Sequence, residues 1–136
     1  MPLEFHPSEA MTLGVEVELQ ILDSKTKDLT PVSPKIFEKL GGELQHIKPE
    51  LMRAMIEINT GVCKSIKEVK RDLEDQITRL EAIGGELGVE FASSGSHPFA
   101  RYSDRIPYPA ERYRYLIDRN RWMARRLMIF GLHVHV

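Results

Sequence analysis

The sequence predicts an α+β fold in which an antiparallel sheet carries its helices on one face. Segments in which apolar and polar residues alternate, at residues 12–23, 55–60 and 132–136, are typical of half-buried β-strands. Between them, residues 66–87 and 111–128 carry apolar side chains at the spacing of amphipathic helices. No repeat or linker divides the 136 residues, so we expect a single domain.

Charge balance and cysteine content narrow the class of protein. The 19 Lys and Arg residues nearly cancel the 20 Asp and Glu residues, which argues against nucleic acid or an anionic membrane as a partner. No apolar run reaches the roughly 18 residues of a membrane span, and the N-terminus lacks the apolar core of a signal peptide. The single cysteine, Cys63, cannot form an intramolecular disulfide. We therefore expect a cytoplasmic protein.

The first predicted strand is TLGVEVELQILD, residues 12–23. Successive side chains of a strand point to opposite faces, which separates an apolar set from a polar set. The apolar set is Leu13, Val15, Val17, Leu19 and Ile21, and the polar set is Glu16, Glu18 and Gln20. Residues 23–28 are rich in turn formers, which predicts a hairpin that returns through residues 29–32.

A short helix and a second strand follow. Ser33 as N-cap and Pro34 as the first helical residue predict the start of the helix, and Gly41–Gly42 predicts its end. The strand is MIEINT, residues 55–60. Its polar face would hold Met55, Glu57 and Asn59, and its apolar face Ile56, Ile58 and Thr60.

A long helix is predicted over residues 66–87, because Ser65 and Glu68 form a capping box ahead of an apolar stripe. Gly84–Gly85 within this helix marks either a close packing point or an early fraying of its end. The next strand is VEFASSG, and a loop rich in proline and aromatic residues follows it over 96–109.

The last helix is predicted from Ala110 to Met128. Its candidates for burial are Tyr113, Leu116, Ile117, Trp122, Met123 and Leu127. The chain then reads GLHVHV, which predicts a strand with Leu132, Val134 and Val136 on one face. His133 and His135 lie on the other face, roughly 6–7 Å apart, where they could reach one metal ion or one polyphosphate.

The polar faces of these strands predict a cluster of charged side chains, if the strands join in one sheet. The cluster would contain Glu16, Glu18, Glu57, His133 and His135. Two carboxylates about 6.5 Å apart repel by roughly 2.5 kcal/mol at an effective dielectric of about 20. Such a cluster is tolerated if it faces water, if arginines neutralise it, or if it holds a divalent cation. Glu-x-Glu alone is more typical of a solvated face, but three separate strands carry groups that can bind a metal on their polar faces, which favours a cation. Mg²⁺ or Mn²⁺ suits carboxylates better than Zn²⁺ does.

Four stretches together resemble the carboxylate–amine ligases of the glutamate–cysteine ligase type 2 family, in the glutamine synthetase-like superfamily. They are, in order, GVEVELQILD, LMRAMIEINTGVCKSIKEVKRDLEDQ, SSGSHPFARY and ERYRYLIDRNRWMARRLMIFGLHVHV. The resemblance covers nearly the whole chain. It departs from the family pattern at Val17, where many members carry a third acidic residue, and at Gly61, where proline is usual. The first change makes the negative cluster smaller, and neither removes a proposed ligand.

The resemblance implies an enzyme that uses ATP and Mg²⁺, or Mn²⁺, to convert a side-chain carboxylate of glutamate to an acyl phosphate and to pass it to an amine such as that of cysteine. Glu16, Glu18 and His133 would then be metal ligands, and His135 would lie near the nucleotide phosphates. Glu57 would be a further ligand or would bind an ammonium group. The resemblance assigns no catalytic acid or base.

His97 lies in a family-like motif and could either take part in the site or only shape a pocket, whereas Cys63 is expected to be a packing residue. Members of the family are much longer, so residues 1–136 would be the N-terminal part of one glutamate–cysteine ligase-like catalytic domain. Such a part would expose a strand edge and an apolar face, which favours self-association into a homo-oligomer.

Two alternatives to a ligase stay open. The first is a non-catalytic module that binds a metal or a nucleotide with the same residues. The second is a zinc hydrolase built on His133 and His135, which is disfavoured because no third ligand follows at a recognisable spacing.

Overall fold

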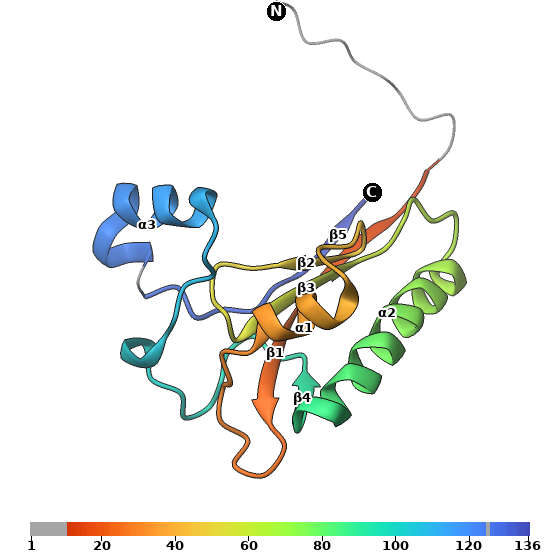
Figure 1. The fold of residues 1–136 in the computed structure, drawn as a ribbon. Helices are drawn as coiled ribbons and strands as arrows, with labels where there is room; N and C mark the ends of the chain where they lie inside the picture. The colour runs from red at the N-terminus through yellow and green to blue at the C-terminus, as the bar shows by residue number, and fades with distance from the viewer. Residues whose placement is uncertain (1–10, 125) are drawn as a thin grey trace, which may run out of the picture.

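The computed structural model, which describes residues 11–124 and 126–136, contains a five-stranded antiparallel sheet (Figure 1). The strands are β1 (Gly14–Asp23), β2 (Ile47–Pro49), β3 (Met55–Asn59), β4 (Val89–Ala92) and β5 (Leu132–His135). The helices are α1 (Ser33–Leu40), α2 (Ile66–Leu87) and α3 (Glu111–Ala124), with a short 3₁₀ turn at Tyr102–Asp104. The predicted α+β class with an antiparallel sheet is therefore confirmed. Within the described residues, no helix is long and apolar enough to cross a membrane.

β1 is the central strand of the sheet. β3 pairs with it through residues 16–20, and β2 pairs with the far side of β3. The other edge of β1 is shared, because β5 pairs with residues 14–17 and β4 with residues 20–23. Two separate strands thus meet the same edge of β1, one beside each half of it.

The main core lies between the sheet and the helices α1 and α2, which cover the apolar face that the alternation predicts (Figure 1). Val17 faces Ile58 and Leu19 faces Ile56 across the β1–β3 pair. Fully buried members of this core are Ile21, Ile36, Ile47, Ile56, Ile58, Leu80 and Cys63. The polar side chains of β1 and β3 consequently point away from α1 and α2.

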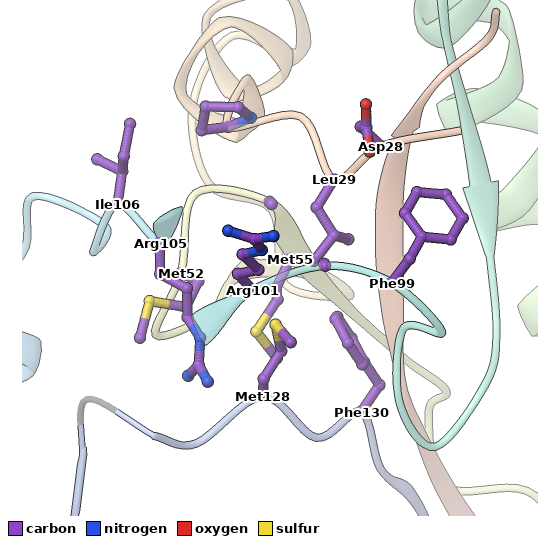
Figure 2. A pocket seen from close by; sticks show the side chains of 13 residues that line it. Asp28, Leu29, Met52, Met55, Phe99, Arg101, Arg105, Ile106, Met128 and Phe130 are labelled. Carbon is purple, nitrogen blue, oxygen red and sulfur yellow. The ribbon is translucent and has the colours of Figure 1, made fainter. Parts of the chain in front are cut away.

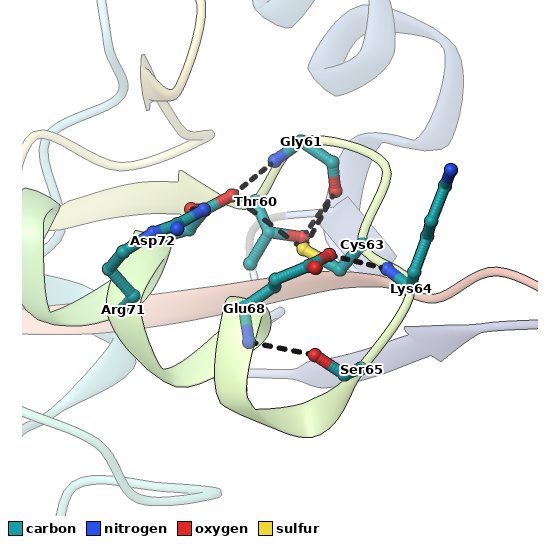
Figure 3. A network of polar contacts seen from close by, with 8 residues as sticks. All are labelled: Thr60, Gly61, Cys63, Lys64, Ser65, Glu68, Arg71 and Asp72. Carbon is teal, nitrogen blue, oxygen red and sulfur yellow. Dashed lines mark hydrogen bonds and ion pairs between the residues drawn. The ribbon is translucent and has the colours of Figure 1, made fainter.

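The start of α2 is fixed by a network of hydrogen bonds (Figure 3). The Ser65 hydroxyl accepts a bond from the Glu68 backbone N–H, as the capping box predicts. The Glu68 carboxylate differs from that pattern, because it accepts the N–H of Lys64 at 2.7 Å. Asp72 accepts the N–H of Gly61, and the buried Cys63 thiol lies 3.6 Å from the same carboxylate. Cys63 is therefore a packing residue in the segment that joins β3 to α2.

Two local predictions are only partly correct or wrong, and one strand was missed. The predicted hairpin is present but short, because the Thr30 N–H donates to the Ile21 carbonyl at 2.8 Å and Leu29 bridges Leu22. Pro31, which has no N–H to donate, and the start of α1 then end the pairing, so residues 29–32 form no regular strand. The N-cap of α1 is Val32, and the buried Ser33 hydroxyl has no hydrogen-bond partner in the described part of the chain. The strand β2 was not predicted, because three residues ending in proline are too short for an alternation pattern to stand out.

The predicted burial of α3 is only partly correct. Tyr113 is buried and Ile117 is partly buried, in a second small core with Leu51, Met52, Met55 and Phe130. The predictions for four other residues are wrong, since Leu116, Trp122, Met123 and Leu127 are exposed. The reason is visible in Figure 1, where α3 stands away from α1 and α2. Its helical path is also broken at Arg121, which has a φ of 45°.

β5 has the predicted alternation, but its apolar face is not covered by a helix as that of β1 is. Val134 pairs with Val15 and shares its face, yet 57% of Val134 is exposed. The helices α1 and α2 therefore cover β1 and β3 but leave the apolar side of β5 open.

Gly84 is a close packing point of α2, the first of the two predicted alternatives. A Cβ at Gly84 would lie 2.8 Å from the Val89 carbonyl oxygen and 2.9 Å from the Phe91 ring, whereas nothing lies within 4 Å of a Cβ at Gly85. We expect Gly84→Ala to destabilise the fold by about 1–3 kcal/mol through this overlap. Gly85→Ala should stabilise it by about 0.5–1 kcal/mol through higher helix propensity. Urea unfolding of both variants checks the pair, and equal effects would contradict the packing contact.

Candidate metal centre

The strand register brings the predicted site residues together on the polar face of the sheet. Glu18 of β1 lies directly opposite Glu57 of β3, and Glu16 lies opposite His133 of β5. Paired residues of neighbouring strands have their Cβ atoms roughly 4.5–5.5 Å apart on the same face. The backbone pairing alone thus places two carboxylates beside each other and an imidazole beside a third.

A third carboxylate, Glu50, completes an acidic cluster with Glu18 and Glu57. Each residue offers one carboxylate oxygen, and these three atoms all lie within 4.8 Å of one another. Sequence reasoning missed Glu50, which follows directly after β2 and is carried into place by the pairing of β2 with β3. The available signal was its position five residues before Met55, where the strand that carries Glu57 begins, but no periodic pattern marks the turn between them.

A backbone or amide N–H group holds each carboxylate of the acidic cluster. The Gly131 N–H donates to Glu18 Oε2 at 2.7 Å, and the Asn59 side chain donates to Glu57 Oε1 at 2.9 Å. The Leu51 N–H donates to Glu50 Oε2 at 2.6 Å. These bonds orient the carboxylates and reduce their rotational freedom, which lowers the entropy cost of binding an ion.

The backbone beside Glu50 is fixed by two side chains of α3. The Tyr113 hydroxyl donates to the Pro49 carbonyl at 2.6 Å, and the Arg112 guanidinium donates to the same oxygen at 3.0 Å. Burial, followed by the negative charge of Glu50, raises the pKa of Tyr113, so the hydroxyl keeps its proton for this bond. α3 therefore contributes to the centre through the position of Glu50.

Glu16 forms a separate group with the two histidines of β5. Its Oε2 lies 3.4 Å from His133 Nδ1 and 3.4 Å from His135 Nε2. Partial desolvation raises the pKa of Glu16, but the contacts with His135 and His133 outweigh it and lower the pKa below its usual value. The five predicted residues thus divide into Glu16 with the two histidines and Glu18 with Glu57.

His133 connects the two groups through Gly131. A Cβ at Gly131 would lie 3.0 Å from His133 Nε2 and 3.6 Å from Glu18 Oε2. The side chains of His133 and Glu18 therefore both lie beside this glycine. Glu18, Glu50 and His133 also line one cavity of about 420 Å³. Its other walls include Tyr113 and Phe130, which gives the polar groups an apolar background. The convergence of charged groups in one cavity is typical of a binding site.

The electrostatics of the acidic cluster favour a cation. Burial raises the pKa of Glu50, and the negative charges of Glu18 and Glu57 raise it further, against the hydrogen bond from Leu51 and the positive charge of Arg112. The Nζ of Lys48 lies 3.9 Å from Glu57 Oε1. Three carboxylate oxygens at this spacing are hard ligands of the kind that Mg²⁺ and Mn²⁺ prefer. The donor set therefore fits such an ion, while the assignment of the ligands stays a prediction.

His97 lies away from these residues and organises a loop. Its Nδ1 accepts the Ala100 N–H at 3.0 Å, so Nε2 carries the proton and donates to the Lys27 carbonyl at 2.9 Å. The side chain is 7% exposed. Of the two roles considered for His97, the structure favours shaping a pocket.

Comparison with known proteins gives a consistent family. The sequence model described as "Glutamate-cysteine ligase family 2(GCS2)" matches residues 12–136. A protein of Gloeobacter violaceus named "Putative glutamate--cysteine ligase 2" is 49% identical over 100% of this chain and 37% of its own length. Proteins of the same name from Bdellovibrio bacteriovorus and Thermobifida fusca are 47% and 40% identical. The chain spans about 36% of the length of the curated relatives that it matches.

We expect Glu50→Gln to stabilise the cation-free protein, because it removes one of three mutually repelling charges. The gain should be on the order of 1 kcal/mol after solvent screening. A carboxyl group whose pKa is raised in the folded state lowers the free energy of unfolding as the pH rises through that pKa. The stabilisation by Glu50→Gln should therefore be small at about pH 4 and larger at pH 7. Thermal unfolding at both pH values measures it. A variant that is less stable than the parent at pH 7 would contradict the repulsion.

Proposed function

We propose that this chain, which belongs to glutamate–cysteine ligase family 2, holds the divalent cations of an ATP-dependent carboxylate–amine ligase. The main support for the proposal is the acidic cluster of Glu18, Glu50 and Glu57, in which one carboxylate oxygen of each residue lies within 4.8 Å of the others. A ligase of this kind must bring the negatively charged ATP phosphates to a negatively charged carboxylate. Mg²⁺ at the cluster supplies the positive charge that makes this approach favourable.

The proposed reaction forms an amide in two steps. The γ-carboxylate oxygen of glutamate, or of a similar acid, attacks the terminal phosphorus of ATP, and ADP leaves. The amine nitrogen of cysteine, or of another acceptor, then attacks the carbonyl carbon of the acyl phosphate. A C–N bond forms, the C–O bond to phosphate breaks, and the amine loses a proton. Positioning and neutralisation of charge account for most of the acceleration in such phosphoryl transfers.

Residues of this chain have separate tasks in the proposed reaction. Glu18, Glu50 and Glu57 hold the cation, and the Gly131 N–H keeps Glu18 oriented toward it. His133 lines the same cavity and is proposed as a further ligand, with Glu16 as the carboxylate that orients its imidazole.

His135, which follows His133 in β5, also contacts the Glu16 carboxylate. We assign it to the nucleotide phosphates, as the resemblance implies, because an imidazole N–H can donate a hydrogen bond to a phosphate oxygen. Since the chain covers about 36% of the curated relatives, the remaining contacts to ATP and to both substrates belong to the proposal for the whole protein.

Cation binding by this chain tests directly whether the acidic cluster is a metal site. We expect Mn²⁺, followed by electron paramagnetic resonance, to bind stoichiometrically and to be displaced by Mg²⁺. Glu18→Gln should weaken Mn²⁺ binding by at least about tenfold, because it removes a charged ligand from the cluster. Glu81→Gln, an exposed glutamate of α2, is the matched control and should leave binding unchanged. Equal binding by both variants would exclude the cluster as the cation site.

A chimaera tests the activity. Residues 1–136 would replace the corresponding segment of the Gloeobacter violaceus relative, with which they share 49% identity. We expect phosphate release that requires glutamate, cysteine and Mg²⁺. Glu18→Gln should decrease it at least about 100-fold, while the melting temperature without a cation is unchanged or slightly higher. An active parent with an inactive chimaera that still binds Mn²⁺ would favour the alternative of a non-catalytic binding module.

A further inference from the structure

A cavity between the 3₁₀ turn Tyr102–Asp104 and the last part of α3 contains an arginine in contact with two aromatic rings. Its volume is about 520 Å³, within the usual range for small-molecule sites. Among the described residues, it shares no lining side chain with the cavity that holds Glu18 and Glu50. The proposed reaction therefore does not use it.

Arg126 is the central group of this cavity. Its guanidinium carbon lies 4.2 Å from the centre of the Trp122 ring and 4.8 Å from the centre of the Tyr102 ring. Both distances lie within the range of cation–π contacts. The Nη2 atom of Arg126 also donates to the Tyr102 hydroxyl at 3.0 Å. These contacts hold the guanidinium in one position, so a ligand does not have to order it on binding.

Arg126 and both rings can be reached by a ligand. Tyr102 is 50% exposed and Trp122 is 61% exposed, and Arg126 is also exposed. A guanidinium has five N–H donors, and within the described residues the structure shows one hydrogen bond from this group, to Tyr102. Aromatic rings cover the faces of a guanidinium while its edges stay able to donate. Arg126 can therefore donate to an anion without leaving either ring.

Arg105 adds positive charge to the cavity but cannot contact a ligand. Its guanidinium nitrogens are shielded from solvent and have no hydrogen-bond partner among the described residues. Arg105 and Met52 also line a neighbouring cavity of about 350 Å³, which extends to Met55 and Phe130 (Figure 2). No described acidic side chain lines the cavity of Arg126. Its potential is therefore positive, which favours an anion over a cation as the ligand.

The walls of the cavity define the rest of the ligand. Met52, Pro107 and Ile117 supply apolar surface, and Tyr102 and Trp122 supply flat aromatic surface. An aromatic ring packs against such surfaces and removes them from water. A doubly charged phosphate would lose more hydration in this apolar surrounding than one guanidinium replaces, whereas a single carboxylate matches its planar fork.

We propose that this cavity binds a small aromatic carboxylate. The carboxylate accepts hydrogen bonds from Arg126, and the ring packs against Trp122 and the apolar wall formed by Met52 and Ile117. The inference goes beyond the proposed ligase activity and stands without it, because binding at Arg126 requires neither a cation nor ATP.

Trp122 is the single tryptophan of the chain, so its indole N–H gives one identifiable signal in a spectrum of ¹⁵N-labelled protein. We expect phenylacetate to shift this signal saturably, with a dissociation constant on the order of 1 mM. Phenylacetamide has the ring without the charge, and acetate has the charge without the ring. Each should bind at least about tenfold more weakly. No saturable shift with phenylacetate, or equal binding by either of the other two compounds, would overturn the proposal.

Variants separate binding by Arg126 from a role in shaping the cavity. Arg126→Met keeps the apolar stem and should weaken phenylacetate binding at least about tenfold, with little change for phenylacetamide. Arg126→Lys keeps the charge but not the planar fork and should bind phenylacetate at intermediate strength. Arg79→Met, which changes an exposed arginine of α2, is the matched control and should bind as the parent does. Parent-like binding of phenylacetate by Arg126→Met, or an equal proportional loss of both compounds, would show that Arg126 does not bind the carboxylate.

Discussion

The pairing of β1 with strands on both of its edges is the constraint on which the rest of the structure depends. Because side chains alternate along a strand, one register fixes two results at once. The Val17–Ile58 and Leu19–Ile56 pairs face the helices, and the Glu18–Glu57 pair faces the opposite side. A shift of one residue would place carboxylates in the core and aliphatic side chains in the cavity. The apolar core thus determines the geometry of the charged site.

The acidic cluster contains an unfavourable interaction, the repulsion between its three carboxylates. Glu18, Glu50 and Glu57 repel one another, and the negative charges of Glu18 and Glu57 add to the rise that burial causes in the pKa of Glu50. Hydrogen bonds from Gly131, Asn59 and Leu51 keep the three carboxylates aimed together instead of letting them turn away into water. Concentrated strain of this kind is common at functional sites.

Sequence reasoning recovered what depends on regular periodicity. The faces of β1 and β3 and the capping box at Ser65 follow from local patterns, whereas Gly84–Gly85 left close packing and fraying as alternatives that the structure decides. It failed where distant segments decide the outcome. Glu50 enters the site through the short strand β2, and Val134 stays exposed because α1 and α2 do not reach β5. Among the described residues, the guanidinium nitrogens of Arg105 have no hydrogen-bond partner, and this is likewise invisible in the sequence, since it depends on which side chains surround them.

The central claim is that Glu18, Glu50 and Glu57 form a cation site. The most direct test is anomalous diffraction from crystals of the chain grown with Mn²⁺. The account predicts an anomalous peak in contact with oxygens of all three carboxylates, at the 2.0–2.3 Å or so expected for oxygen ligands of such ions. A peak elsewhere, or ordered carboxylates that turn apart without bound Mn²⁺ at saturating concentration, would contradict it.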